Sequence, residues 1–290
     1  MNIFFTLITF LLFFSSTYVK ANLAYITNEK DNTVSVIDIA KKKVIKTVKV
    51  GQRPRGIIMS KDGKLVLIAT SDDDRVEVRD AVTMKLKYHL PSGPDPELFI
   101  LSPEDDVLYI ANEDDAMVTV VDMNDKMIID DIPVGVEPEG MGLTNNGKIL
   151  VNTSETTNMA HFIDTDTLEI TENVLVDARP RVAVFTPDDR EVWVSAEIGG
   201  TVKVINPGSK AVTHTISFEI PGVNEESIQP VGVRHTNDGK YTFVALGPAN
   251  RIAVIDQKTK KVMKYLLVGQ RVWQLAFTPD QKTLLSTNGV

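Results

Sequence analysis

A repeat with a period of 42 residues runs through this chain and constrains its fold more than any other feature. Asp38, Asp80, Asp122, Asp164 and Asn206 follow one another at this interval, and Asp256 follows after 50 residues. Prolines keep the same step at positions 54, 96, 138 and 180, with Pro230 again 50 residues later. One insertion of eight residues within 217–228 accounts for both longer intervals. A fixed period of this length indicates a repeat architecture in which each copy is one supersecondary unit.

Each repeat contains about four short runs in which apolar and polar residues alternate, a pattern typical of antiparallel strands. One strand position is apolar in six copies, occupied by Val34, Val76, Val118, Ala160, Val202 and Ile252. Turn segments recur in phase between the runs, from SKDGK at Ser60 to TPDQK at Thr278. Four-stranded units repeated radially form a β-propeller. We therefore predict an all-β propeller of four-stranded blades.

The number of blades depends on the two ends of the chain. Strands within 23–50 would be the outer three strands of a last blade, and the sequence stops after the second strand of the blade before it. Unpaired sheet edges are a liability that closed propellers avoid. We therefore expect seven blades in the full-length form, with the last blades incomplete in this chain. The alternative is a six-bladed ring, closed by pairing of 272–278 with the strands of 23–50.

The first 21 residues are expected to be a signal peptide. The apolar run from Ile3 to Phe14 is too short for an ordinary membrane span, and Val19 and Ala21 are small residues at the positions that signal peptidase reads. No Lys or Arg precedes the run, so an uncleaved anchor is the alternative. We predict cleavage after Ala21, a single propeller domain over 22–290, a periplasmic location and no membrane insertion after cleavage.

Composition excludes several classes of function. The net charge of -8 does not suit a nucleic-acid partner, and the absence of cysteine removes disulfides, thiolate nucleophiles and cysteine-type zinc sites. The sequence has no nucleophile elbow, no phosphate-binding glycine loop and no histidine pair with metal spacing. Acidic runs at 72–74 and 113–115 lack the spacing of a calcium loop and are expected to be solvated. We therefore predict no catalytic residue and no metal site.

The four histidines differ in the kind of residue that occupies the equivalent position, or column, of the other repeats. His89, His161 and His214 occupy positions that are polar in the other repeats, so solvated positions are expected for them. His235 occupies a position otherwise filled by Met59, Leu101, Leu143, Phe185 and Phe277. A polar group in an apolar column needs a hydrogen-bond partner. We therefore expect His235 to be buried and structurally satisfied.

Charged residues flank the repeated proline, where the inner strand of a blade would begin at the mouth of the ring. The candidate site consists of Arg53, Arg55, Asp95, Glu97, Glu137, Glu139, Arg179, Arg181, Arg271 and Trp273, with Gln229 and Val231 at the equivalent places of one repeat. One interpretation is a set of ion pairs between blades. The other is that the arginines, with Trp273 as a stacking face, receive a small planar polyanion or an acidic protein loop.

Several segments resemble known repeats. YITN at Tyr25, YIAN at Tyr109 and the strands VSVID and VTVVD resemble YVTN repeats. The segments FEIPGVNEESIQPVGV, FVALGPANRIAVID and LLVGQRVWQLAFTPD resemble the exported β-propeller proteins associated with pyrroloquinoline quinone (PQQ)-dependent catabolism, which are often encoded beside quinoprotein alcohol dehydrogenases and transport components.

The resemblance implies a non-catalytic periplasmic binding or accessory module of quinoprotein alcohol catabolism. Its partner would be a quinoprotein dehydrogenase, a transport component or a small anionic ligand, bound by the mouth and the insertion at 217–228. The alternative from another class is a cofactor-binding propeller with an oxidoreductase role, holding PQQ or haem d1. Because the chain has no cysteine for haem attachment and no repeated tryptophan motif, its residues predict no cofactor.

Overall fold

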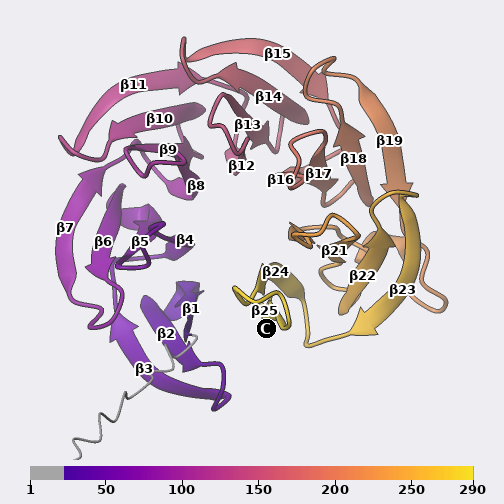
Figure 1. The fold of residues 1–290 in the computed structure, drawn as a ribbon, viewed down its shortest axis with the longest axis horizontal. Helices are drawn as coiled ribbons and strands as arrows, with labels where there is room; N and C mark the ends of the chain where they lie inside the picture. The colour runs from indigo at the N-terminus through magenta and orange to yellow at the C-terminus, as the bar shows by residue number, and fades with distance from the viewer. Residues whose placement is uncertain (1–22, 290) are drawn as a thin grey trace, which may run out of the picture.

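Short antiparallel strands joined by tight turns make up most of residues 23–289, the part of the chain that the computed structural model describes. Seven sheets follow one another around a ring (Figure 1). Five of them have four strands each and are called blades 1 to 5. A three-stranded N-terminal sheet and a two-stranded C-terminal sheet flank them. The prediction of an all-β propeller with four-stranded blades is confirmed.

The strands of each blade run outward from the centre in chain order (Figure 1). Blade 1 comprises β4 (Pro54–Met59), β5 (Leu65–Thr70), β6 (Arg75–Asp80) and β7 (Leu86–Pro91); blade 2 comprises β8 (Pro96–Leu101), β9 (Val107–Asn112), β10 (Met117–Asp122) and β11 (Met127–Pro133). Blade 3 comprises β12 (Pro138–Leu143), β13 (Ile149–Ser154), β14 (Met159–Asp164) and β15 (Glu169–Leu175); blade 4 comprises β16 (Pro180–Phe185), β17 (Val192–Ala196), β18 (Thr201–Ile205) and β19 (Val212–Ser217). Blade 5 comprises β20 (Val233–His235), β21 (Tyr241–Ala245), β22 (Arg251–Asp256) and β23 (Lys261–Leu267).

The partial sheets occupy the two ends of the series. The N-terminal sheet contains β1 (Leu23–Asn28), β2 (Thr33–Asp38) and β3 (Lys43–Lys49), and the C-terminal sheet contains β24 (Val272–Phe277) and β25 (Leu284–Asn288). Five blades and the N-terminal sheet make six, which agrees in number with the six-blade alternative. The closure expected for it is wrong, because β24 pairs with β25 and makes no ladder with β1 to β3 within residues 23–289. Seven blades stay a prediction.

Each blade is covered on both faces by its neighbours. Leu67 and Ile68 are adjacent in β5 and point to opposite faces, yet both are fully buried. Leu67 packs with Phe99 of blade 2, whereas Ile68 packs with Val34 of the N-terminal sheet. Side chains at a polar position of a middle strand therefore face another blade and not solvent. For this reason His161 of β14, expected to be solvated, is only 5% exposed.

Alternate sheets share features that the 42-residue period does not predict. In the turn after the inner strand, blades 1, 3 and 5 have glycine where the next sheet has a longer side chain. That side chain accepts a hydrogen bond from the preceding turn, as Asp105 does from the Lys61 amide (2.6 Å) and Asp189 from the Asn145 amide (2.9 Å). Gln281 of the C-terminal sheet likewise accepts from the Asn237 amide (3.1 Å). The sheets are thus linked as pairs: 1 with 2, 3 with 4, and 5 with the C-terminal sheet.

Short irregular elements join the strands. Among residues 23–289, three 3-10 turns lie at η1 (Glu29–Asp31), η2 (Ser71–Asp73) and η3 (Glu225–Ser227). The insertion at 217–228 buries Phe218, Ile220 and Ile228 against blades 4 and 5. No helix in the described range is long and apolar enough to cross a bilayer. The predicted signal peptide at 1–21 lies outside the described residues.

Candidate functional site

The residues that flank the repeated proline gather where the inner strands begin, and we call this region the mouth. At three of these positions, the backbone is held by a turn that lies 21 residues earlier in the chain. The amides of Arg53, Arg179 and Arg271 donate to the side chains of Asn32, Asn158 and Asn250 at 2.8, 3.1 and 2.7 Å. This repeated bond fixes the backbone just before β4, β16 and β24.

Arg53 and Arg55 of blade 1 are paired with carboxylates of blade 2. Arg53 Nη1 contacts both oxygens of Asp95 at 3.0 and 2.9 Å, and its Nη2 lies 3.0 Å from Glu97 Oε1. Arg55 Nε donates to the other Glu97 oxygen at 2.5 Å. Asp95, Glu97 and Glu113 lie close enough to share one cation. Because Arg53 also lies 3.6 Å from Glu113, its guanidinium already supplies the positive charge at that point.

Arg181 of blade 4 holds the second group of carboxylates. It is only 3% exposed, its Nη2 lies 3.0 Å from Glu139 Oε1, and its Nη1 donates to Glu155. Glu197 Oε2 lies 3.7 Å from its Nε. Arg179 Nε lies 2.7 Å from Glu155 Oε2. These contacts fit the ion-pair interpretation of the mouth for blades 1 to 4.

The paired carboxylates are themselves largely buried. Burial and the neighbouring Glu139 carboxylate raise the pKa of Glu97 to about 9, against the opposing effect of Arg55. Burial therefore disfavours the charged form of Glu97, although both of its oxygens accept from arginine donors. Of the predicted acidic site residues, Glu137 stays outside the ion pairs of the described chain, and it accepts a hydrogen bond from Thr156.

Glu155 and Glu197 were missed by sequence reasoning, although the repeat carries a signal for them. They share one column with Glu29 and Glu113, each 42 or 84 residues from the next. Glu29 also reaches the mouth, 3.2 Å from Arg55 Nη1. In blade 5 this column contains Gly247. The third pair of sheets therefore lacks the carboxylate that the others place beside the arginines.

The mouth residues of the third pair are Gln229, Val231, Arg271 and Trp273. The Trp273 ring lies near two guanidiniums, with the Cζ of Arg181 at 5.0 Å and that of Arg271 at 5.5 Å from its centroid. Arg271 is exposed, and within residues 23–289 no carboxylate oxygen lies within 4.0 Å of its guanidinium. The structure thus brings Arg181, Arg271 and Trp273 together. This part of the mouth is cationic and aromatic.

The histidines do not reach the mouth. His161 Nδ1 bonds Asn173 Oδ1 at 2.5 Å, and its Nε2 accepts from the Gly135 amide at 3.0 Å. His235 is 8% exposed, with Thr242 Oγ1 at 2.8 Å and the Val184 carbonyl at 3.4 Å, so its predicted burial and satisfaction are confirmed. His89 and His214 lie on the exposed outer strands β7 and β19. Haem iron takes an axial side-chain ligand, commonly histidine, and no histidine is placed to serve at the mouth.

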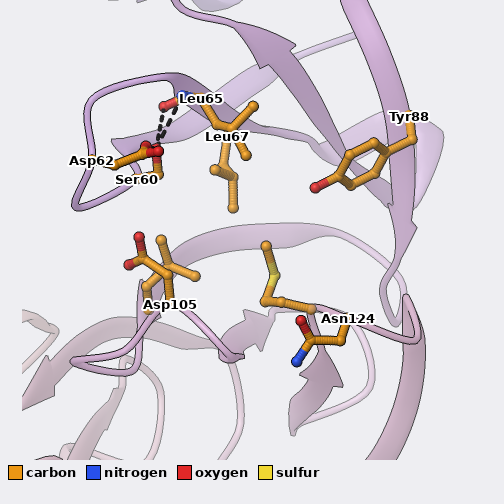
Figure 2. Close-up of a pocket in the computed structure, with 9 residues that line it drawn as sticks. Ser60, Asp62, Leu65, Leu67, Tyr88, Asp105 and Asn124 are labelled. Carbon is orange, nitrogen blue, oxygen red and sulfur yellow. Dashed lines mark hydrogen bonds between the residues drawn. The ribbon is translucent and has the colours of Figure 1, made fainter.

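A cavity of about 260 Å³ lies between blades 1 and 2, at the opposite end of β4 from the mouth (Figure 2). Leu65, Leu67 and Tyr88 line one side, and Asp105 and Asn124 line the other. Ser60 bonds the Leu65 backbone and Asp62 within its own turn. Thr186 and Asp188 make the same bond in the equivalent turn of blade 4, so the Ser60–Asp62 pair is a repeated feature of the turn and does not indicate catalysis.

Comparisons with known proteins support the fold. The family model described as the cytochrome D1 haem domain matches residues 10–97, less than a third of the 290-residue chain. The hydrazine synthase structure from Kuenenia stuttgartiensis is 19% identical, with a TM-score of 0.83 over 92% of this chain and 89% of that one. At this identity the likeness shows the β-propeller fold alone. The search of curated proteins finds no match. The YVTN and PQQ-linked resemblance is not confirmed.

Proposed function

We propose that this protein is a binding propeller that holds a planar, anionic molecule of cofactor size against Trp273. The observation on which the proposal depends is the position of Trp273 near both Arg181 and Arg271. Trp273 and Arg271 belong to the pair of sheets whose mouth lacks acidic residues. Aromatic faces stack on planar ligands, and guanidinium groups bind carboxylates through paired hydrogen bonds. Arg271 has its donors free of carboxylates within the described range, so it is the cation available to a ligand.

The partial match to a haem domain model favours a cofactor as this ligand. The residues do not fit haem held through an axial histidine, because both buried histidines have both ring nitrogens engaged. They fit a planar ring system that carries carboxylates and is held by its face and its charges. PQQ and the carboxylate-bearing face of a tetrapyrrole share this chemistry. In this proposal the chain supplies stacking and charge, and we assign it no catalytic residue.

A role beside a quinoprotein dehydrogenase or a transport component rests on the resemblance within 217–290, and a periplasmic location rests on residues 1–21. The insertion limits how a protein partner could dock. Phe218, Ile220 and Ile228 are buried in the core between blades 4 and 5. A partner would therefore contact the exposed part, which includes Glu225 and Glu226.

The proposal is tested by titrating the purified protein separately with PQQ and with haem while recording tryptophan fluorescence. We expect quenching in the wild type and its loss in Trp273→Phe. Trp193 is the internal reference, because it is fully buried with its indole nitrogen 3.0 Å from Glu191. Arg271→Gln should weaken binding by about tenfold, the loss of one charge-assisted contact. Quenching that persists unchanged in Trp273→Phe would contradict the proposal.

A further inference from the structure

Arg234 is an arginine of the inner strand of blade 5 that has no acidic partner. It stands opposite Phe243 in the β20–β21 register. Its Nη1 donates to the Val233 carbonyl at 2.7 Å, the one hydrogen bond that its side chain makes among residues 23–289. No carboxylate oxygen of the described residues lies within 4.0 Å of its guanidinium. A guanidinium has five N–H donors, so most of them have no protein acceptor.

The side of β20 that bears Arg234 faces the C-terminal sheet. Gly232 is on the same side of the strand, and a Cβ there would lie 3.0 Å from Gln274 of β24. Phe243, opposite Arg234, packs edge-on against Phe277 with ring centroids 5.5 Å apart, beside the buried Leu275. The guanidinium is therefore positioned beside an apolar interface. Arg234 is half-buried, and burial lowers the pKa of its guanidinium.

The other repeats show that this position does not require a charge. The equivalent residues are Ile58, Ile100, Gly142, Val184 and Ala276, all apolar or small. A cation that loses part of its hydration beside apolar side chains is costly unless a counter-charge or hydrogen bonds replace the lost water. Arg181, only 3% exposed, has three carboxylates around it, whereas Arg234 is half-buried and has none in the described structure.

We propose that Arg234 binds an oxyanion, a carboxylate or phosphate-type group, between blade 5 and the C-terminal sheet. The anion would accept from the free guanidinium donors, and a planar fork of donors suits two oxygens of one group. Gln274, on the facing strand, is placed to offer its side-chain amide. This subsite differs from the mouth, because Arg234 comes four residues after Pro230 along the inner strand. It does not depend on ligand binding at Trp273.

Inorganic phosphate is the first probe. The melting temperature of the full chain is measured in sodium phosphate and in sodium chloride at equal ionic strength. At phosphate about ten times its dissociation constant, we expect the wild type to melt about 3 °C higher than in chloride. Arg234→Val, which copies the residue of blade 4, should lose this increase and melt at least as high as the wild type in chloride. Arg190→Gln, a change at an exposed arginine, is the matched control and should keep the increase.

Two results would overturn the inference. One is a phosphate response that survives intact in Arg234→Val, which would place the anion elsewhere, for instance at Arg271. The other is a wild type without any phosphate-specific increase. Failure of this proposal is distinguishable from failure of the mouth proposal, because PQQ quenching of Trp273 should be the same in Arg234→Val as in the wild type.

Discussion

The first two pairs of sheets carry both arginines and acidic residues at their mouth positions, whereas the third pair carries no acidic residue there. In blades 1 and 2, two arginines face two acids, and in blades 3 and 4, two acids face two arginines. Their arginines are paired with buried carboxylates. The third pair has Gln229 and Val231 facing Arg271 and Trp273, with no acidic residue at the four positions.

The difference shows that the type of residue and its place in the repeat do not define its role. Arg181 and Arg271 are near neighbours of the same tryptophan, but one is buried among three glutamates and the other is exposed without a carboxylate. An arginine that neutralises buried acids mainly stabilises the ring. An arginine left without them keeps its donors for a ligand.

The largest expected effect separates these two arginines by stability. Arg181→Ala leaves Glu139, Glu155 and Glu197 without their shared cation, so the free energy of unfolding should fall by about 3 to 5 kcal/mol. Arg271→Ala removes an exposed side chain and should change it by less than about 0.5 kcal/mol. Urea denaturation monitored by circular dichroism measures both. Equal losses in the two variants would remove the distinction between the two parts of the mouth.

The second prediction concerns acid. Burial lowers the pKa of His235 to about 4 from its ordinary 6.5, so the folded state favours the neutral ring. The unfolded chain then binds more protons, and stability falls as the pH decreases from 6.5 to 4, by about 3 kcal/mol. His235→Phe, which copies Phe185 of blade 4, should flatten this part of the stability profile. The exposed His214→Asn is the control and should leave the profile unchanged.

The third prediction concerns alkali and the paired part of the mouth. Because the pKa of Glu97 is raised from 4.5 to about 9, the folded state keeps a proton that the unfolded chain has released. Stability should therefore fall as the pH rises from about 4.5 to about 9. The nearby arginines favour the charged form, so we expect the loss to be only about 1 to 2 kcal/mol. Glu97→Gln should remove this slope, and the exposed Glu104→Gln should not. A slope that persists in Glu97→Gln would mean that another group holds the proton.

Much of the fold follows from the sequence, because each repeat encodes its own strands and turns. The 42-residue interval predicts the blades, and the apolar column of His235 predicts its burial. The expectation that His161 is solvated is wrong. The alternation of apolar and polar residues along a strand was taken to mean that one face of each sheet meets water, whereas neighbouring blades cover both faces. The linked pairs of sheets repeat every 84 residues, the interval between Asp105 and Asp189. This longer period can be recognised in the sequence only once the hydrogen bonds between the turns are known.

The candidate site was predicted in part. The repeated proline located its residues, because a column in the sequence becomes a ring in space. Which arginines are paired could not be read from that column alone. Glu155 and Glu197 come from a different column, in the turn between the second and third strands, and the distance between the two columns is a property of the folded blade.

The smallest expected change in stability tests the comparison most directly. Gln229 occupies the place that Glu137 and Arg179 fill in the second pair, and its side chain donates to the Glu226 carbonyl at 3.0 Å. Gln229→Glu would give the third pair an acidic mouth residue. At this partly exposed position the free energy of unfolding should change by less than about 0.5 kcal/mol. The affinity for an anionic planar ligand should fall by about tenfold, because the new carboxylate repels the ligand and competes for Arg271. Gln229→Ala removes the amide without adding charge and should keep the affinity. If both variants bind PQQ as the wild type does in the fluorescence titration, the absence of acid at this mouth position has no bearing on binding.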